Sequence, residues 1–134
     1  MFLLFFYSCG NNDTQDNTPA SENDVDAARN FIQSALSGDY RKARTFVLPD
    51  SVNYQYLDAF ENNYKNRMTN QDKAGYSIAS INIHNVKTVN DSTSIINYSN
   101  SYKQQDDSLK VVKSNGQWLV DLKYSFSQPN DTLK

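Results

Sequence analysis

The chain has 134 residues, of which 38% are hydrophobic and 13% aromatic, and its formal net charge is −2. This length suits one domain, and the aromatic share excludes a disordered chain. The slightly negative charge opposes binding to a phosphate backbone, so we expect no nucleic-acid partner. One cysteine and one histidine exclude a disulfide framework and a multi-cysteine or histidine-rich metal site, so we expect no metal and no cofactor.

The single cysteine lies between an apolar run and a polar segment. Residues 1–6 are apolar and are followed, after Tyr7, by Ser8-Cys9-Gly10. The run is too short to cross a bilayer, which needs about 20 residues, but it fits the end of a secretory signal peptide. The pattern resembles the bacterial lipobox, which implies that residues 1–8 are removed and that Cys9 is the lipidation site, a palmitate-type membrane anchor. The alternative is that Cys9 is an ordinary small hydrophobic residue.

The residues on either side of the apolar run and Cys9 also bear on the lipoprotein interpretation. No Lys or Arg precedes the apolar run, so we expect a basic segment upstream of Met1. Residues 10–23 contain no aromatic side chain, so residues 9–23 are predicted to be the acylated cysteine and a disordered tether of about 45 Å when extended. We therefore expect a lipid-anchored protein of the bacterial cell envelope, with the outer membrane favoured and the domain in the periplasm or at the cell surface.

Three helices are predicted at the start of the folded domain, residues 24–128. Asp24 can cap the first helix, and Gly38 takes the position just after its end. Asp39 and Asp50 can cap a second and a third helix, which Pro49 separates. The expected apolar faces are Val25, Ala28, Phe31, Ile32, Ala35 and Leu36 in the first helix, Tyr40, Ala43, Phe46 and Val47 in the second, and Val52, Tyr56, Leu57, Phe60, Tyr64 and Met68 in the third.

From residue 73 the apolar residues follow the period of a strand. The first strand contains two slips of phase, between Ile78 and Ile81 and between Ile83 and Val86, of the kind that β-bulges produce. Asn115-Gly116 is a strong signal for a two-residue hairpin. The predicted strands are residues 76–89, 96–102, 109–113 and 118–126, and residues 129–134 are a flexible tail. The sequence thus predicts the α+β fold class, with three N-terminal helices packed on a curved four-stranded antiparallel sheet.

Three segments carry a resemblance to a known fold family. They are Ala27-Ala28 through Phe31, Leu36-Ser37-Gly38-Asp39-Tyr40 with Ala43, and Asn115-Gly116-Gln117-Trp118-Leu119-Val120-Asp121. Residues 24 to about 126 resemble the nuclear-transport-factor-2-like, cystatin-like cone domains of bacterial lipoproteins of unknown function. The resemblance implies a curved sheet around a long helix, often with a pocket and often dimeric, so a homodimer is a candidate assembly. It implies no particular activity, because this fold carries isomerases, dehydratases and binding proteins.

No arrangement of residues in the sequence indicates a catalytic site. The acidic residues fall mostly in predicted caps and turns, and Asp121, the one most firmly inside a strand, alternates to the face opposite Trp118. His84 is expected at the surface or rim of the first strand, between Asn82 and Asn85, rather than as a general base. We therefore expect no catalytic residue.

Aromatic side chains are predicted to converge between the helices and the sheet. They either line a pocket for an apolar or planar ligand or form a plain aromatic core. The candidate pocket residues are Tyr56, Tyr64, Tyr98, Tyr102, Trp118, Tyr124 and Phe126. Separately, the pattern of Asp, then Ser or Thr, then a small or aliphatic residue marks Ser92, Ser108 and Thr132 as candidate O-glycosylation sites in predicted turns and the tail.

Two functions from different classes fit these observations. In the first, the domain is a non-catalytic envelope module that binds a small ligand or a partner protein of the envelope and is held to the membrane by its N-terminal lipid. In the second, it is a small enzyme of the same fold, of the isomerase or dehydratase type, that acts on an apolar substrate. The lack of a clear acid–base pair favours the first hypothesis.

Overall fold

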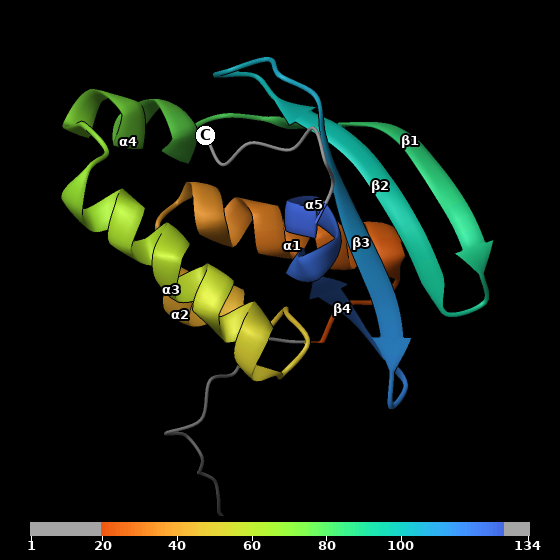
Figure 1. The fold of residues 1–134 in the computed structure, drawn as a ribbon. Helices are drawn as coiled ribbons and strands as arrows, with labels where there is room; N and C mark the ends of the chain where they lie inside the picture. Colours follow the sequence, from red (N-terminus) through yellow and green to blue (C-terminus); the bar gives the residue numbers. More distant parts are fainter. Residues whose placement is uncertain (1–19, 128–134) are drawn as a thin grey trace, which may run out of the picture.

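The computed structural model describes residues 20–127, with side chains described as far as residue 125. Its helices and strands are α1 (Asp24–Leu36), α2 (Tyr40–Arg44), α3 (Ser51–Asn66), α4 (Asn70–Ser77), β1 (Ile81–Asn90), β2 (Thr93–Asn100), β3 (Asp107–Ser114), β4 (Gln117–Asp121) and α5 (Leu122–Ser127). The strands form one antiparallel sheet in the order β1-β2-β3-β4. The sheet curves around the helices, and α1 contacts all four strands (Figure 1). The predicted α+β fold is confirmed.

The helix boundaries follow from capping residues. Asp39 and Asp50 accept hydrogen bonds from the backbone N–H groups of Lys42 and Asn53, so both predicted caps are confirmed. The cap of α1 is Asn23 rather than Asp24, which is already helical. The Asp24 carboxylate instead accepts a hydrogen bond from the Ser94 hydroxyl at 2.6 Å, which joins α1 to β2.

Gly38 ends α1 as predicted. Its φ of +77° lies in the left-handed region, which glycine adopts without strain. The N–H of Gly38 bonds to the carbonyl of Ala35, and that of Asp39 bonds to the carbonyl of Ser34. These two bonds form a Schellman motif, which satisfies the last carbonyls of the helix and turns the chain toward α2.

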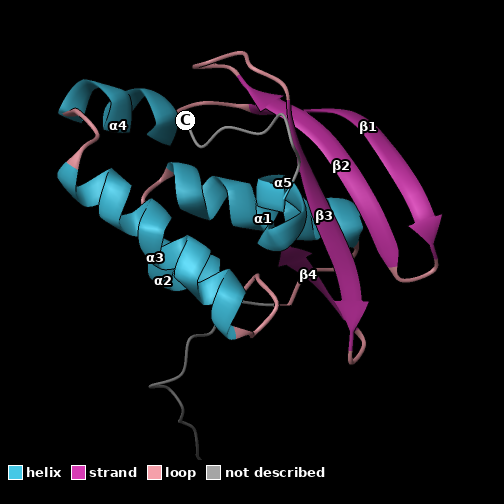
Figure 2. Cartoon of the chain, in the orientation of Figure 1, coloured by secondary structure: helices cyan, strands magenta, loops and turns pink. Residues whose placement is uncertain are grey.

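The segment before the sheet differs from the prediction. A first strand was expected to begin at Tyr76, but residues 70–77 form the helix α4 (Figure 2). The cap of this helix is the Thr69 hydroxyl. The strand begins at Ile81, so the phase slip expected between Ile78 and Ile81 is not a bulge. The second predicted slip is confirmed, because the register of β1 on β2 shifts between Ile83 and Asn85.

The end of the sheet also differs from the prediction. The hairpin at Asn115-Gly116 is confirmed, with φ values of +51° and +79° that fit a type I′ turn. The last strand, expected to continue to residue 126, ends at Asp121 and is followed by α5. The outer edge of β4 is covered, because residues 46–48 hydrogen-bond to both sides of Val120.

The core lies between α1, α3 and the sheet. Ala28, Phe31 and Ile32 of α1 are buried as expected. In α3, Leu57 is buried as expected at 1% exposure, but the buried face is rotated at the start of the helix, where Asn53 is buried and Val52 is 41% exposed. The rotation brings the polar Asn53 into the interior, where its side chain has hydrogen-bonding partners. No helix in the described part of the chain is long and apolar enough to cross a membrane.

Candidate functional site

A cavity of about 320 Å³ lies between the helices and the sheet. Its apolar wall comes from α1, α3, β2 and β3, and includes Phe31, Leu36, Tyr64, Tyr98 and Leu109. Folded interiors contain few voids larger than a water molecule, whose share of liquid volume is about 30 Å³. The cavity is therefore a pocket of the size that small-molecule ligands occupy, rather than a packing defect.

The helical wall is fixed by close packing of two tyrosines. The rings of Tyr40 and Tyr64 meet edge to face, with their centroids 5.9 Å apart. A Cβ atom at Gly38 would lie 2.3 Å from the Tyr64 ring, so the glycine leaves room for this ring as well as ending α1. On the other side, the Lys73 ammonium lies 4.9 Å from the centroid of the Tyr64 ring.

The loop between β2 and β3 forms the polar rim of the cavity. The Asn100 side chain accepts hydrogen bonds from the backbone N–H groups of Tyr102 and Lys103, which shapes the start of this loop. Lys103 and Asp106 line the cavity and are exposed. The rim therefore carries both signs of charge.

Tyr102 joins the loop to α4, whose Tyr76 lines the cavity. Its hydroxyl donates a hydrogen bond to Asp72 at 2.7 Å, and its ring meets Tyr76 edge to face at 4.9 Å. A Cβ atom at Gly75 would lie 2.2 Å from this ring, so the contact depends on the glycine. The hydrogen bond to the Asp72 carboxylate raises the pKa of Tyr102, and burial raises that of Tyr76. No side chain of α4 is fully buried, so these contacts are a large part of what holds the helix.

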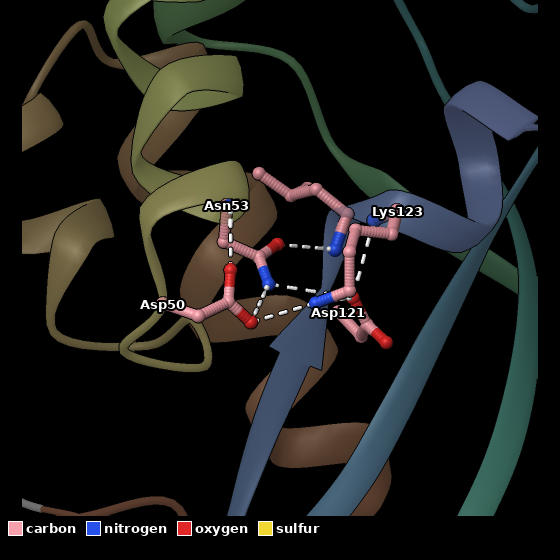
Figure 3. Close-up of polar contacts among 5 residues, drawn as sticks. Asp50, Asn53, Asp121 and Lys123 are labelled. Carbon is pink, nitrogen blue, oxygen red and sulfur yellow. Dashed lines mark hydrogen bonds and ion pairs between the residues drawn. The ribbon is translucent and has the colours of Figure 1, made fainter.

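A polar cluster around the buried Asn53, which we call the Asn53 cluster, positions α5 (Figure 3). It consists of Asp50, Asn53, Asp121, Lys123 and the backbone N–H of Leu122. Fully buried Asn53 accepts a hydrogen bond from this N–H at 2.7 Å and donates to Asp50 and Asp121 at 3.1 and 3.3 Å. The cluster fixes α5, which contributes Leu122 and Ser125 to the cavity.

Lys123 closes this cluster on its exposed side. Its ammonium lies 2.6 Å from Asp50 Oδ2 and 3.1 Å from Asp121 Oδ1. The hydrogen bond from Lys123 holds the pKa of Asp50 below its ordinary value. Burial opposes the charged form of Lys123, but its hydrogen bonds to both carboxylates outweigh that effect and raise its pKa. The pairing explains how Asp121, a buried carboxylate, is accommodated in the fold.

The structure brings only some of the predicted aromatic residues to the cavity. Tyr64 and Tyr98 line it, whereas Tyr56 and Trp118 pack against the core without being among the lining residues described. Tyr102 lies on the rim loop, and Tyr124 lies half-buried in α5. The side chain of Phe126 lies outside the described residues.

Other lining residues were not predicted, because no pattern around them indicates a pocket. They include Phe31, Tyr40, Met68 and Tyr76. Tyr40 was expected on the apolar face of α2, and it is buried there. Tyr76 was expected to begin a strand, and only the Thr69 cap signals the helix that carries it to the cavity.

His84 lies at the edge of the sheet with its side chain 43% exposed. Its Nε2 is 2.8 Å from the Ser99 hydroxyl and 3.5 Å from Asp106 Oδ1. Both contacts involve the same ring nitrogen, whereas a catalytic triad uses Nε2 for the serine and Nδ1 for the aspartate. No group of three or more metal-ligating His, Cys, Asp or Glu side chains occurs within residues 20–127.

The predicted modification sites lie in different settings. Ser92 is exposed in the turn between β1 and β2. Ser108 lies in β3, where it pairs with Asn97, and its side chain is half-buried rather than in a turn. Cys9 and Thr132 lie outside the described residues.

Comparison with known proteins supports the fold. A solved structure of an NTF-2-like protein of unknown function from Shewanella oneidensis MR-1 superposes with a TM-score of 0.51, covering 72% of this chain and 89% of that chain at 12% sequence identity. The chain therefore has the nuclear-transport-factor-2-like fold that its sequence resembles. No protein-family model and no curated protein matches the sequence.

Proposed function

We propose that the chain is a lipid-anchored protein of the bacterial cell envelope whose cone domain binds a small, largely apolar molecule without transforming it. The observation that carries the proposal is the cavity of about 320 Å³ between α1, α3 and the sheet. Much of its wall is aromatic or aliphatic, and its charged lining residues, Lys103, Asp106 and Asp107, are exposed. Such a pocket removes the body of a ligand from water and leaves one end near solvent.

The placement of the acidic groups favours binding over catalysis. The carboxylates that line the cavity, Asp106 and Asp107, are both exposed on the rim. An acid–base enzyme of this kind needs a carboxylate inside the apolar pocket, where burial adjusts its pKa to the reaction. The Asn53 cluster does hold a buried carboxylate, Asp121, but its hydrogen bonds to Asn53 and Lys123 occupy it structurally.

A fluorescent probe tests the binding proposal. N-phenyl-1-naphthylamine, a neutral planar molecule, fluoresces strongly in apolar surroundings, and we expect it to bind the full chain at micromolar concentration. Ala35 lines the cavity, so Ala35→Phe fills part of it and weakens binding at least tenfold. The matched control is Ala59→Phe, because Ala59 is exposed on α3. Equal binding by the wild type and Ala35→Phe would contradict a ligand site in the cavity.

The lipid anchor rests on Cys9 and the polar segment that follows it. Acyl chains on Cys9 hold a protein to a bilayer by about 0.8 kcal/mol per buried CH₂ group. In the native bacterium, the wild type is expected in the membrane fraction with the mass of acyl chains on its first peptide. Cys9→Ser is expected in the soluble fraction. An unmodified Cys9 in the mature protein would reject the anchor and leave the binding proposal standing.

A further inference from the structure

Tyr40 is a buried tyrosine in the lining of the cavity. We propose that its hydroxyl donates a hydrogen bond to an uncharged oxygen acceptor of the ligand, so that the cavity selects apolar molecules carrying a ketone, aldehyde or ester carbonyl. The inference rests on the proposed function, since it names the chemical class that the same cavity takes.

Tyr40 is a buried polar side chain whose hydroxyl has no partner among the residues that the structure describes. It lines the cavity, is 9% exposed, and makes no hydrogen bond to another residue in the range 20–127. Buried tyrosine hydroxyls ordinarily have a hydrogen-bond partner, because an unpaired donor loses its bond to water without replacement. A ligand in the cavity can supply the missing acceptor.

The donor is held in place before a ligand arrives. Tyr40 is the first residue of α2, whose cap is the Asp39 carboxylate. Its ring packs edge to face on Tyr64, which in turn occupies the space beside Gly38. A fixed donor needs little ordering when the ligand binds, so the hydrogen bond contributes more fully to affinity.

The charge around Tyr40 favours a neutral acceptor. Burial, the neighbouring Tyr64 and the Glu61 carboxylate, in that order of size, together raise the pKa of Tyr40 to about 12. The hydroxyl therefore keeps its proton at neutral pH and can donate it. Glu61, on α3, forms an ion pair with Lys65 at 2.9 Å, and its carboxylate opposes a second anionic group beside the hydroxyl. A carbonyl accepts the bond without that repulsion.

A matched pair of ligands isolates this hydrogen bond. 2-Acetylnaphthalene and 2-ethylnaphthalene have nearly the same size, but only the first carries a carbonyl. Both are titrated against the full chain by displacement of N-phenyl-1-naphthylamine. Tyr40→Phe removes only the donor, and we expect it to weaken binding of the ketone about three- to tenfold and binding of the hydrocarbon less than twofold. The control is Tyr76→Phe, at the α4 side of the cavity, which should change both affinities equally.

The outcomes separate this inference from the proposed function. If both ligands bind and Tyr40→Phe affects them equally, the cavity is a ligand site and Tyr40 is not its donor. If neither ligand binds the wild type, both proposals are overturned. A second measurement uses the wild type alone, so it tests the inference even if Tyr40→Phe fails to fold. The infrared carbonyl stretch of bound 2-acetylnaphthalene should lie below its frequency in a hydrocarbon solvent, and an unshifted frequency overturns the inference.

Discussion

Asn53, in the first turn of α3, accepts a hydrogen bond from the backbone N–H of Leu122 at 2.7 Å, although 69 residues separate them. The bond forms at the residue where β4 ends and α5 begins. The same amide group donates to Asp50 and Asp121, so each of its polar atoms has a partner in the interior. The Asn53 cluster thereby couples the start of α3 to the helix that completes the cavity.

Replacing Asn53 should therefore lower the free energy of unfolding more than replacing an exposed residue of α3. In Asn53→Ala the N–H of Leu122 loses its buried acceptor and Asp121 loses a donor. We predict a loss of about 2–3 kcal/mol in the free energy of unfolding, measured by urea denaturation. Asn62→Ala, at an exposed position of the same helix, should change it by less than about 0.5 kcal/mol. Similar losses in the two variants would show that the cluster contributes little.

The cluster should also make stability depend on pH. The pKa of Asp50 is lowered in the folded state from its ordinary 3.8, so its ionised form stabilises the fold above that pH, and the contribution is lost as the pH falls through the folded pKa. Asp50→Asn keeps a capping side chain but removes the charge that pairs with Lys123. We predict that the wild type unfolds at higher urea than Asp50→Asn at pH 7. This difference should shrink below pH 3.8, and a constant difference across that range would contradict the assignment.

Gly38 and Gly116 form a natural matched pair, because their φ values are +77° and +79°. Alanine at Gly116 meets no atom within 4 Å, so Gly116→Ala should cost only backbone strain, about 1 kcal/mol. Alanine at Gly38 adds a clash with the Tyr64 ring, and Gly38→Ala should cost about 2–4 kcal/mol. Gly38→Ala should also weaken probe binding, whereas Gly116→Ala should not. If Gly38→Ala and Gly116→Ala lose the same unfolding free energy, the Tyr64 ring moves away from the new methyl group without cost, which would contradict the close packing.

Gly75→Ala tests the contact between α4 and the rim loop. The new methyl group would displace the Tyr102 ring and break its hydrogen bond to Asp72. Since that hydrogen bond raises the pKa of Tyr102, the pKa should fall toward its ordinary 10.0 in the variant. Asp72→Asn should lower it as well, while Ser77→Ala, at an exposed position of α4, should leave it unchanged. NMR titration of carbon-labelled tyrosine measures these values, and an unaltered Tyr102 in Gly75→Ala would contradict the contact.

The parts of the fold that depend on local signals could be predicted from the sequence. Asp39 and Asp50 cap helices because their side chains reach N–H groups three residues away. Gly38 and Asn115-Gly116 mark positions where the chain needs a positive φ. The resemblance to the nuclear-transport-factor-2-like fold rests on segments around these residues, and it agrees with the structural comparison.

The parts that depend on distant partners could not be predicted. The alternation from Trp118 to Phe126 fits a continuous strand, and only the hydrogen bond that the Leu122 N–H donates to Asn53 shows why the strand ends at Asp121. A buried asparagine carries no local signal, so the inward face of α3 was placed one residue away, at Val52. The cavity depends on the packing of several elements, and an aromatic pattern alone did not separate a pocket from a core.

Whether the cavity holds a small apolar ligand is tested most directly by native mass spectrometry of the protein purified gently from its own bacterium. We expect a folded species heavier than the polypeptide and its anchor by one small organic molecule, which is released on denaturation and missing from Ala35→Phe. A folded wild-type protein with no additional mass, identical in this respect to Ala35→Phe, would contradict this expectation.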